Sequence, residues 1–183
     1  MKKFFKRLLI VLLVLAGLVL VFLAYMGVLS KPSVSETKMG PYLFVYEEYV
    51  GPYMNSGKIF DKVYKSVKTD GIETEKGLGI YFDNPSKVPA DKLRSQCGVV
   101  IENKDAAKFA KISKKYKSKK IKAAKNLVVV FPIRNSLSYA VGPMKAYPAL
   151  MEYAQAKGYK ITGTYELYDM QAGKIFFVME VKK

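Results

Sequence analysis

The sequence predicts an α+β fold in which tandem β-α-β-β repeats form an antiparallel sheet with two helices on one face, preceded by one N-terminal transmembrane helix. Three observations support this prediction. A long uncharged segment opens the chain, segments then follow in the order strand, helix, strand, strand, and the same order returns in the second half. Because strands outnumber helices, we expect the helices to cover one face of the sheet and a cleft between the repeats to form on the other.

Residues 1–29 are expected to form a membrane anchor. Four basic residues precede residues 8–29, which carry no charged side chain and are long enough as a helix to cross about 30 Å of hydrocarbon. A cleaved signal peptide is the alternative, although its apolar core would usually span only about 7–15 residues. By the positive-inside rule, the basic N-terminus predicts a single-pass protein with a cytoplasmic N-terminus and a domain on the outer, periplasmic or extracellular, side.

The rest of the chain is long enough for one domain with its own core. The expected divisions are a tether at residues 30–41, then a domain at 42–183 that consists of repeat one at about 42–103, a basic linker at 104–125 and repeat two at 126–183.

Composition excludes several kinds of chemistry. The chain has 31 Lys and Arg against 15 Asp and Glu, a formal net charge of +16, no histidine and a single cysteine, Cys97. Without histidine, Ser-His-Asp and Cys-His nucleophiles are excluded, and with only one cysteine we expect no metal site and no cofactor. Cys97 cannot form an intrachain disulfide and is expected to be a small buried side chain in a strand.

The first repeat begins with a strand from Leu43 that ends at Gly51-Pro52. Apolar residues then recur every three or four positions as far as Val67, which predicts a helix with one buried face. Two further strands are expected at residues 78–82 and 98–101.

The segment GIYFDNPSKVPADKLR, residues 79–94, predicts the turn between these two strands. Its β-branched and aromatic residues at 80–82 favour an extended chain. Asp83-Asn84-Pro85 then supplies a side-chain acceptor and a fixed φ for a turn, and Pro89 excludes a central strand there.

The second repeat is expected to contain a strand, a helix and two paired strands, at residues 127–133, 147–156, 162–168 and 175–181. The segment Ala140-Val141-Gly142-Pro143 repeats the pattern of Tyr49-Val50-Gly51-Pro52, the end of the first strand of repeat one.

The linker from Lys104 to Lys125 is rich in lysine, which leaves two interpretations open. Its charge could attract anionic lipid head groups or the phosphates of a nucleic acid. Alternatively, the linker is a solvated connector whose like charges keep it exposed. No specific nucleic-acid partner is expected, because no helix-turn-helix, RNA-binding motif or zinc finger is visible.

A second motif, Tyr165-Glu166-Leu167-Tyr168, lies in the penultimate strand. Alternation along a strand places Glu166 and Tyr168 on one face, with Tyr165 and Leu167 on the other. A carboxylate beside an aromatic ring in a cleft would favour a ligand with a cationic or polarised centre. The alternative is an exposed strand glutamate beside a half-buried tyrosine.

The segment at 79–94 resembles the "YYDNP…VPPDKLR" signature of the GyrI-like small-molecule-binding domains, and a looser resemblance extends from about Leu43 to Val181. The resemblance implies tandem β-α-β-β units and a ligand pocket with a glutamate from a "YExY" strand. Many members use a tryptophan in the pocket or in the second helix, whereas this sequence has none.

The resemblance implies a site around Glu166. Carried over to this sequence, Glu166 is the pocket carboxylate, and the aromatic residues expected near it are Tyr168, Tyr165, Tyr81, Tyr46 and Tyr139. The function implied is membrane-anchored binding of a small organic ligand, cationic or aromatic, in a cleft between the repeats. Two alternatives remain: a hydrolase of reactive small molecules with Glu166 as catalytic base, or a membrane-associated scaffold or receptor without a small ligand.

An N-terminal membrane helix before such a domain also resembles the architecture of an animal single-pass receptor for autophagy of the endoplasmic reticulum. The acidic disordered tail of that receptor has no counterpart before Lys183. Its receptor function is therefore not carried over.

Overall fold

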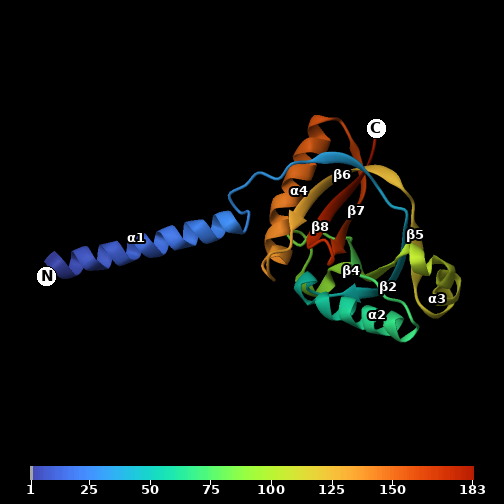
Figure 1. The fold of residues 1–183 in the computed structure, drawn as a ribbon. Helices are drawn as coiled ribbons and strands as arrows, with labels where there is room; N and C mark the ends of the chain where they lie inside the picture. The colour runs from blue at the N-terminus through green and yellow to red at the C-terminus, as the bar shows by residue number, and fades with distance from the viewer. Residues whose placement is uncertain (1) are drawn as a thin grey trace.

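A curled antiparallel sheet forms the body of the molecule, and one long helix projects away from it (Figure 1). The computed structural model describes residues 2–183, with only the backbone described at Lys2 and Lys104. Met1 of the expected anchor and the Lys104 side chain of the expected lipid-binding segment therefore lie outside the described part. The helices are α1 (Lys2–Tyr25), α2 (Gly57–Thr69), α3 (Phe109–Lys115) and α4 (Ser138–Ala156), with short 3-10 turns at Tyr53–Asn55, Ala90–Lys92 and Asn103–Lys108.

Helix α1 is long and apolar enough to cross a membrane over Lys3–Tyr25. None of its most apolar stretch is buried against the body, so it is not a core helix of the domain. A signal sequence near the N-terminus would have the same length and composition.

The sheet has eight strands in the order β1-β6-β8-β7-β3-β4-β2-β5. The strands are β1 (Ser35–Met39), β2 (Tyr42–Val50), β3 (Lys76–Tyr81), β4 (Arg94–Ile101), β5 (Ser118–Ile121), β6 (Ala124–Pro132), β7 (Lys160–Asp169) and β8 (Lys174–Lys182). All neighbours pair antiparallel, and the predicted α+β class is confirmed.

Two units with the order strand, helix, strand, strand make up most of the sheet. We call β2-α2-β3-β4 the first unit and β6-α4-β7-β8 the second unit. They meet in the middle, where β3 pairs with β7 and Leu78 lies opposite Leu167. The central contact therefore joins the third element of each unit.

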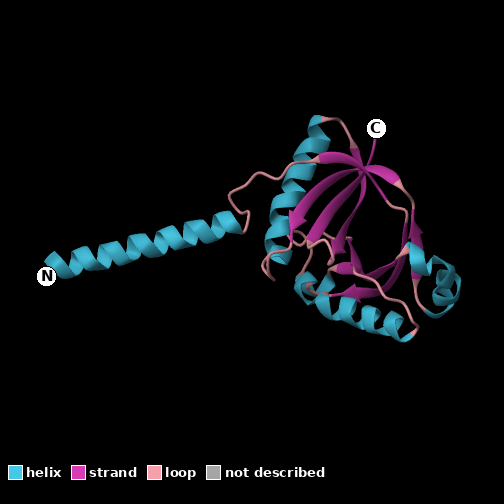
Figure 2. Ribbon diagram, in the orientation of Figure 1, coloured by secondary structure: helices cyan, strands magenta, loops and turns pink. Residues whose placement is uncertain are grey.

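Helices α2 and α4 pack on the same face of the sheet, as predicted (Figure 2). Helix α2 buries Val63 and Val67 against β2 and β4, and α4 buries Ala146 and Leu150 against β6 and β8. The opposite face has a separate core, formed by alternate residues of the same strands and including Phe44, Leu78, Val128, Tyr165 and Val178. Burial of both faces explains why these strands are rich in β-branched and aromatic residues.

Two segments that were expected to be connectors contain regular structure. The tether includes β1, which pairs with β6 as an edge strand of the sheet. The lysine-rich linker includes α3, whose Phe109 and Ile112 are buried against the core below α2, and β5, which pairs with β2. Because lysines dominate this segment of the sequence, its few apolar residues did not reveal that it packs on the domain.

Ala140–Pro143 repeats the pattern of Tyr49–Pro52 but has a different structure, because α4 begins at Ser138, before the expected helix at 147–156, and includes this segment. Small residues explain the difference. Ser138, Gly142 and Ala146 recur every four positions and are buried, and a Cβ at Gly142 would lie only 2.7 Å from the Phe177 ring. The small side chains let the helix approach the sheet closely, which a search for large apolar residues does not detect.

Candidate ligand-binding site

Glu166 lies at the centre of a buried polar and aromatic cluster between α2 and α4. Its side chain is 5% exposed, and alternation along β7 directs it to the face that carries the helices. The Tyr147 hydroxyl of α4 donates a hydrogen bond to Oε1 at 2.9 Å, and the Tyr168 hydroxyl of β7 donates one to Oε2 at 2.5 Å. Both carboxylate oxygens thus have tyrosine donors.

Aromatic rings from both units surround this carboxylate. The Tyr168 ring lies 5.3 Å from the Phe60 ring of α2 and 5.9 Å from the Tyr139 ring of α4, measured between centroids. The Tyr168 hydroxyl is also 3.0 Å from that of Tyr81 in β3, and the Tyr81 ring packs edge-on against Tyr53. The hydrogen-bonded tyrosines therefore link the first unit to Glu166.

Two glycines of β3 lie beside this cluster, on the strand that pairs with β7. Gly79 pairs with Glu166 across the β3–β7 contact, and Gly77 pairs with Tyr168. A Cβ at Gly79 would lie 2.9 Å from the Tyr81 ring, and one at Gly77 would lie 3.4 Å from the Phe60 ring. Because glycine has no side chain, aromatic rings occupy the space directly above β3.

Burial raises the pKa of the Glu166 carboxyl to about 7, although the hydrogen bonds from Tyr168 and Tyr147 oppose this shift. Burial and the neighbouring carboxylate raise the pKa values of Tyr147 and Tyr168 well above their usual range. Among the described residues, no lysine or arginine forms an ion pair with Glu166. The carboxylate thus lacks a counter-ion within a chain of net charge +16.

The structure brings together four of the six residues predicted for the site, namely Glu166, Tyr168, Tyr81 and Tyr139. Tyr165 and Tyr46 lie on the opposite face, where Tyr165 is buried in the second core and Tyr46 stacks on Phe44. The strand alternation itself places Tyr165 on the far side from Glu166.

The expectation of a cleft on the face without helices is wrong for this cluster. Glu166 and Tyr168 contact Tyr147 of α4 and Phe60 of α2, so their face is the one that the helices cover. The face without helices is packed by its own apolar core. The site therefore lies between the helices.

Sequence reasoning missed Tyr147 and Phe60. Tyr147 was recognised only as the start of a helix, and Phe60 only as one of several apolar positions on a helix face. A sequence signal for Tyr147 exists, because Tyr139 and Tyr147 are two helical turns apart on α4. That relation becomes visible only once α4 is known to begin at Ser138.

The DNP segment joins β3 to β4, as predicted. The Arg94 side chain donates two hydrogen bonds to the Asp83 carboxylate, at 3.0 and 2.8 Å, and the Arg94 backbone N–H donates a third at 2.7 Å. The Asn84 Oδ1 accepts from the backbone N–H of Ser86 at 2.8 Å. The Tyr53 hydroxyl bonds the backbone of Asp83 and Arg94, so this turn holds the ring that packs on Tyr81.

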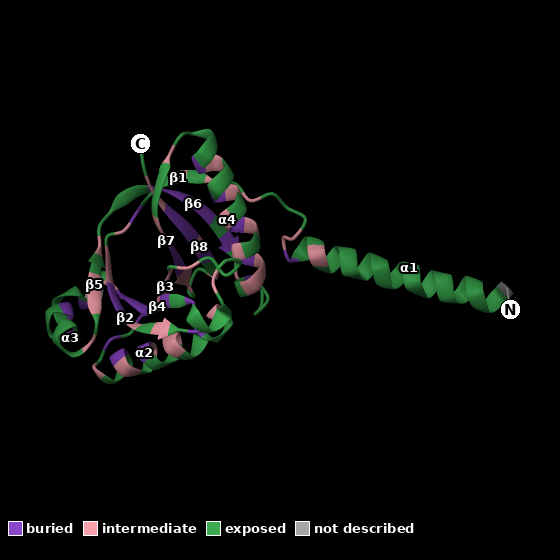
Figure 3. Ribbon diagram, turned by 180° about the vertical axis from the view of Figure 1, so that it is seen from behind, coloured by how far each residue is buried: buried purple, intermediate pink, exposed green. Residues whose placement is uncertain are grey.

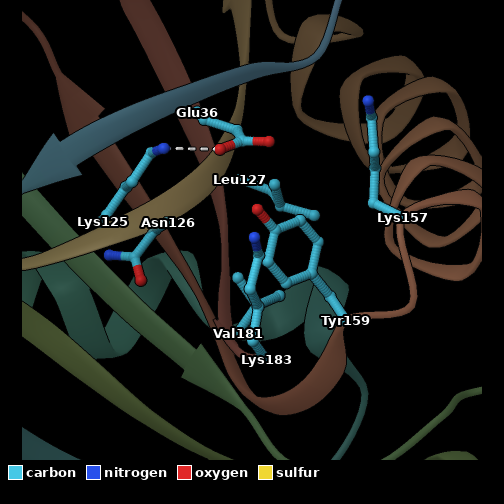
Figure 4. A pocket seen from close by; sticks show the side chains of 8 residues that line it. All are labelled: Glu36, Lys125, Asn126, Leu127, Lys157, Tyr159, Val181 and Lys183. Atoms are coloured by element: carbon cyan, nitrogen blue, oxygen red, sulfur yellow. Dashed lines mark ion pairs between the residues drawn. The ribbon is translucent and has the colours of Figure 1, made fainter.

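A cavity of about 420 Å³ lies elsewhere, near the C-terminal end of α4 (Figure 4). Its lining includes Glu36, which forms an ion pair with Lys125 at 2.7 Å and accepts a hydrogen bond from Tyr153 at 3.2 Å. These contacts hold β1 against β6 and α4. They satisfy the only carboxylate side chain among the lining residues, so the cavity is part of the attachment of β1 to the domain.

No protein-family model matches the sequence, and no curated protein matches it. Solved structures do. The EcmrR C-terminal domain has a TM-score of 0.58 at 14% identity, with 83% of this chain and 98% of that chain covered. EcmrR in its DNA complex has a TM-score of 0.57 at 13% identity, with 100% and 70% covered.

A third similar structure is SAV2435 bound to tetraphenylphosphonium, with a TM-score of 0.50 at 14% identity and 82% and 93% of the two chains covered. These proteins share the GyrI-like fold, and the chain has the same fold.

Proposed function

We propose that this chain binds a small organic cation at Glu166, in the space between α2 and α4. One observation carries the proposal: a buried carboxylate lies among aromatic rings, and within the described part of the chain it is bonded only by tyrosine hydroxyls and has no cationic partner. Burial of an unpaired charge is unfavourable, and a ligand cation would supply the missing charge. The faces of the surrounding rings would attract the same cation.

The glycines of β3 supply room for such a ligand. Tyr81 covers Gly79 and Phe60 covers Gly77, and both rings are only half-buried. Rotation of these rings away from the sheet would open the space above Glu166 without moving the backbone. SAV2435, which shares the fold, is bound to tetraphenylphosphonium in its structure, and this supports a hydrophobic cation as the probe.

Anchoring by α1 is part of the same proposal, with the N-terminus in the cytoplasm and the domain on the outer side. Its support is the uncharged length of the helix after the basic N-terminus, which fits the positive-inside rule.

Lipid binding by the segment Lys104–Lys125 has less support. Five of its lysines bond to other side chains, namely Lys108, Lys115, Lys117, Lys119 and Lys125. The segment also includes α3, which lies on the far side of the body from α1 in Figures 1 and 3. We therefore regard the segment as a structural part of the domain, formed by α3 and β5, rather than as a lipid-binding surface.

Calorimetric titration of the full-length protein in detergent micelles with tetraphenylphosphonium tests the proposal. We expect Glu166→Gln to weaken binding at least about tenfold at a pH of about 8, a loss of roughly 1.4 kcal/mol or more. The matched control is Glu73→Gln, which neutralises an exposed carboxyl and should leave the affinity unchanged. Triphenylphosphine oxide, a neutral compound of similar shape, should not distinguish the two variants.

Equal affinity of the wild-type protein and Glu166→Gln for tetraphenylphosphonium would contradict the proposal. So would tighter binding of the neutral compound than of the cation.

The pKa of about 7 also favours a second candidate function, hydrolysis with Glu166 as a general base. A carboxylate with such a pKa can accept a proton at neutral pH more readily than an ordinary glutamate. Multiple turnovers of p-nitrophenyl acetate that Glu166→Gln abolishes and Glu73→Gln retains would support this function. A rate equal in all three proteins would overturn it, because surface lysines alone would then account for the reaction.

A further inference from the structure

The outer face of α4 is apolar, although the chain as a whole is strongly basic. Leu137, just before the helix, Met144 and Met151 are spaced by seven residues and are 48%, 75% and 58% exposed. Pro148 lies exposed between the two methionines. Positions seven apart lie on one side of a helix, so these residues form a single stripe opposite the buried face.

The end of α1 is held against the same part of the domain. The Asn135 amide lies 3.3 Å from the sulfur of Met26, which is 1% exposed. The Arg134 guanidinium lies over the Tyr25 ring at 4.8 Å. These contacts fix the point at which the anchor meets the domain.

The chain that leaves α1 also follows one side of α4. The Lys145 ammonium group donates a hydrogen bond to the Val28 carbonyl at 2.6 Å, and Lys31 pairs with Glu152 at 3.7 Å. Lys145 and Glu152 each directly follow one of the exposed methionines in sequence. The exit segment therefore runs beside the apolar stripe without covering it.

Figures 1 and 3 show where a membrane would lie relative to this stripe. In both views α1 extends from the side of α4 that faces away from the sheet, and the two helices run in clearly different directions. A bilayer spanned by α1 would then lie next to the outer face of α4. Tyr25 and Arg134 would lie at the level of the head groups, where tyrosine rings and basic side chains are favoured.

We propose that the outer face of α4, the stripe Leu137, Met144, Pro148 and Met151, rests on the surface of the bilayer that α1 spans. Apolar side chains on a helix parallel to the membrane plane are stabilised by shallow burial at the head-group boundary, and neighbouring basic groups add attraction to anionic lipids. Arg134, Lys145 and Lys31 provide those groups beside the stripe. This inference rests on the proposed anchoring by α1.

The same contact would bring the ligand site to the membrane surface. Helix α4 also carries Tyr139 and Tyr147 of that site. Tyr139 is 40% exposed, and its hydroxyl lies 3.8 Å from the sulfur of Met170, itself 51% exposed. An amphiphilic cation held at the lipid surface would then reach the aromatic rings without crossing bulk water.

Site-specific fluorescence of the full-length protein in vesicles of phosphatidylcholine and phosphatidylglycerol tests the inference. An environment-sensitive fluorophore is attached to Met144→Cys or Met151→Cys in a Cys97→Ala background. At either methionine position we expect quenching by lipids with a spin label near the head group to be at least about twofold stronger than at Lys65→Cys, an exposed position on α2. If Cys97→Ala does not fold, the same labelling is done with Cys97 retained, because that thiol is buried.

Quenching at Met144→Cys and Met151→Cys no stronger than at Lys65→Cys would overturn the inference. A label at Leu15→Cys, in the middle of α1, separates this outcome from a failure of anchoring. Strong quenching at Leu15→Cys by lipids labelled deep in the acyl chain, with none at the methionine positions, would remove only the membrane contact of α4. Absence of quenching at all three positions would remove the anchor and the contact together.

Discussion

The two central strands, β3 of the first unit and β7 of the second, lie side by side but contribute opposite features to the site. β7 contributes a carboxylate and a tyrosine, Glu166 and Tyr168, whereas β3 contributes the two glycines that face them. The charge on one strand thus lies opposite an absence of side chains on the other. In the candidate site, the second unit thus supplies the carboxylate, whereas the first unit supplies glycines covered by the aromatic rings of Tyr81 and Phe60.

The comparison shows that shared topology does not imply shared function for each strand. In the first unit, the Asp83 carboxylate is paired with Arg94 at the turn, and it stabilises local structure. In the second unit, Glu166 is buried, and its hydrogen-bond donors among the residues that the structure describes are tyrosine hydroxyls. Of these two carboxylates, Glu166, which has no ion-pair partner among the described residues, is the better indicator of a functional site.

Of the substitutions that test the difference between the two strands, Glu166→Gln is expected to have the largest effect, on the pH dependence of the free energy of unfolding. The folded-state pKa of Glu166 is raised to about 7, so the native state holds a proton that the unfolded state releases, and stability falls as the pH rises from the unfolded to the folded pKa. This shift in pKa corresponds to a decrease of roughly 3 kcal/mol in the free energy of unfolding of the wild-type protein between about pH 5 and pH 8. Thermal unfolding followed by circular dichroism in detergent should show Glu166→Gln becoming more stable than wild type as the pH rises.

A difference in Tm between Glu166→Gln and wild type that stays constant over this pH range would contradict the assigned environment. Glu73→Gln, at an exposed position, serves as the control and should follow wild type throughout.

The second effect is expected at Gly79, one of the two glycines of β3. Gly79→Ala would place a Cβ 2.9 Å from the Tyr81 ring, which must shift and weaken its hydrogen bond to Tyr168. We expect a loss of about 2 kcal/mol in unfolding free energy, together with weaker binding of tetraphenylphosphonium. The matched control is Gly57→Ala at the start of α2, where a Cβ would meet nothing within 4 Å. Equal stability of the two variants in urea titrations would show that the glycine is not needed for the ring.

The smallest effect is expected at the turn of the first unit. Arg94 lowers the pKa of Asp83 below its usual range, so this carboxylate contributes stability at neutral pH that is lost as the pH falls into the acidic range. Because the Arg94 side chain is 66% exposed and solvent screens the pair, Asp83→Asn should lower Tm by at most about 2 °C. Asp91→Asn, in the same loop, is the control. A larger loss at Asp83→Asn, or any loss of cation binding, would mean that this turn contributes to the ligand site as well as to local structure.

Much of the fold could be predicted from the sequence because its cues are local. The helical spacing up to Val67 and the turn at Asp83-Asn84-Pro85 are each visible in a short window, and both were confirmed. The site was predicted less well. Alternation correctly paired Glu166 with Tyr168, but Tyr165 and Tyr46 were assigned to the site through the family resemblance, and the strand face excludes them.

The remaining features depend on contacts between distant segments. Strand β1 forms only because β6 offers an edge, and α4 extends back to Ser138 because small residues fit against Phe177. The Tyr147–Glu166 hydrogen bond joins two such segments. No short window of sequence contains the information for these contacts.

Titration of Glu166 shows whether this buried carboxylate needs a cation. Carbon-13 NMR of the labelled glutamate carboxyl groups, with the Glu166 signal assigned by its loss in Glu166→Gln, reports this pKa with and without tetraphenylphosphonium. We expect a pKa of about 7 in the free protein that falls by at least about one unit when the cation binds. An ordinary pKa in the free protein, or a raised pKa that the cation does not change, would contradict this expectation.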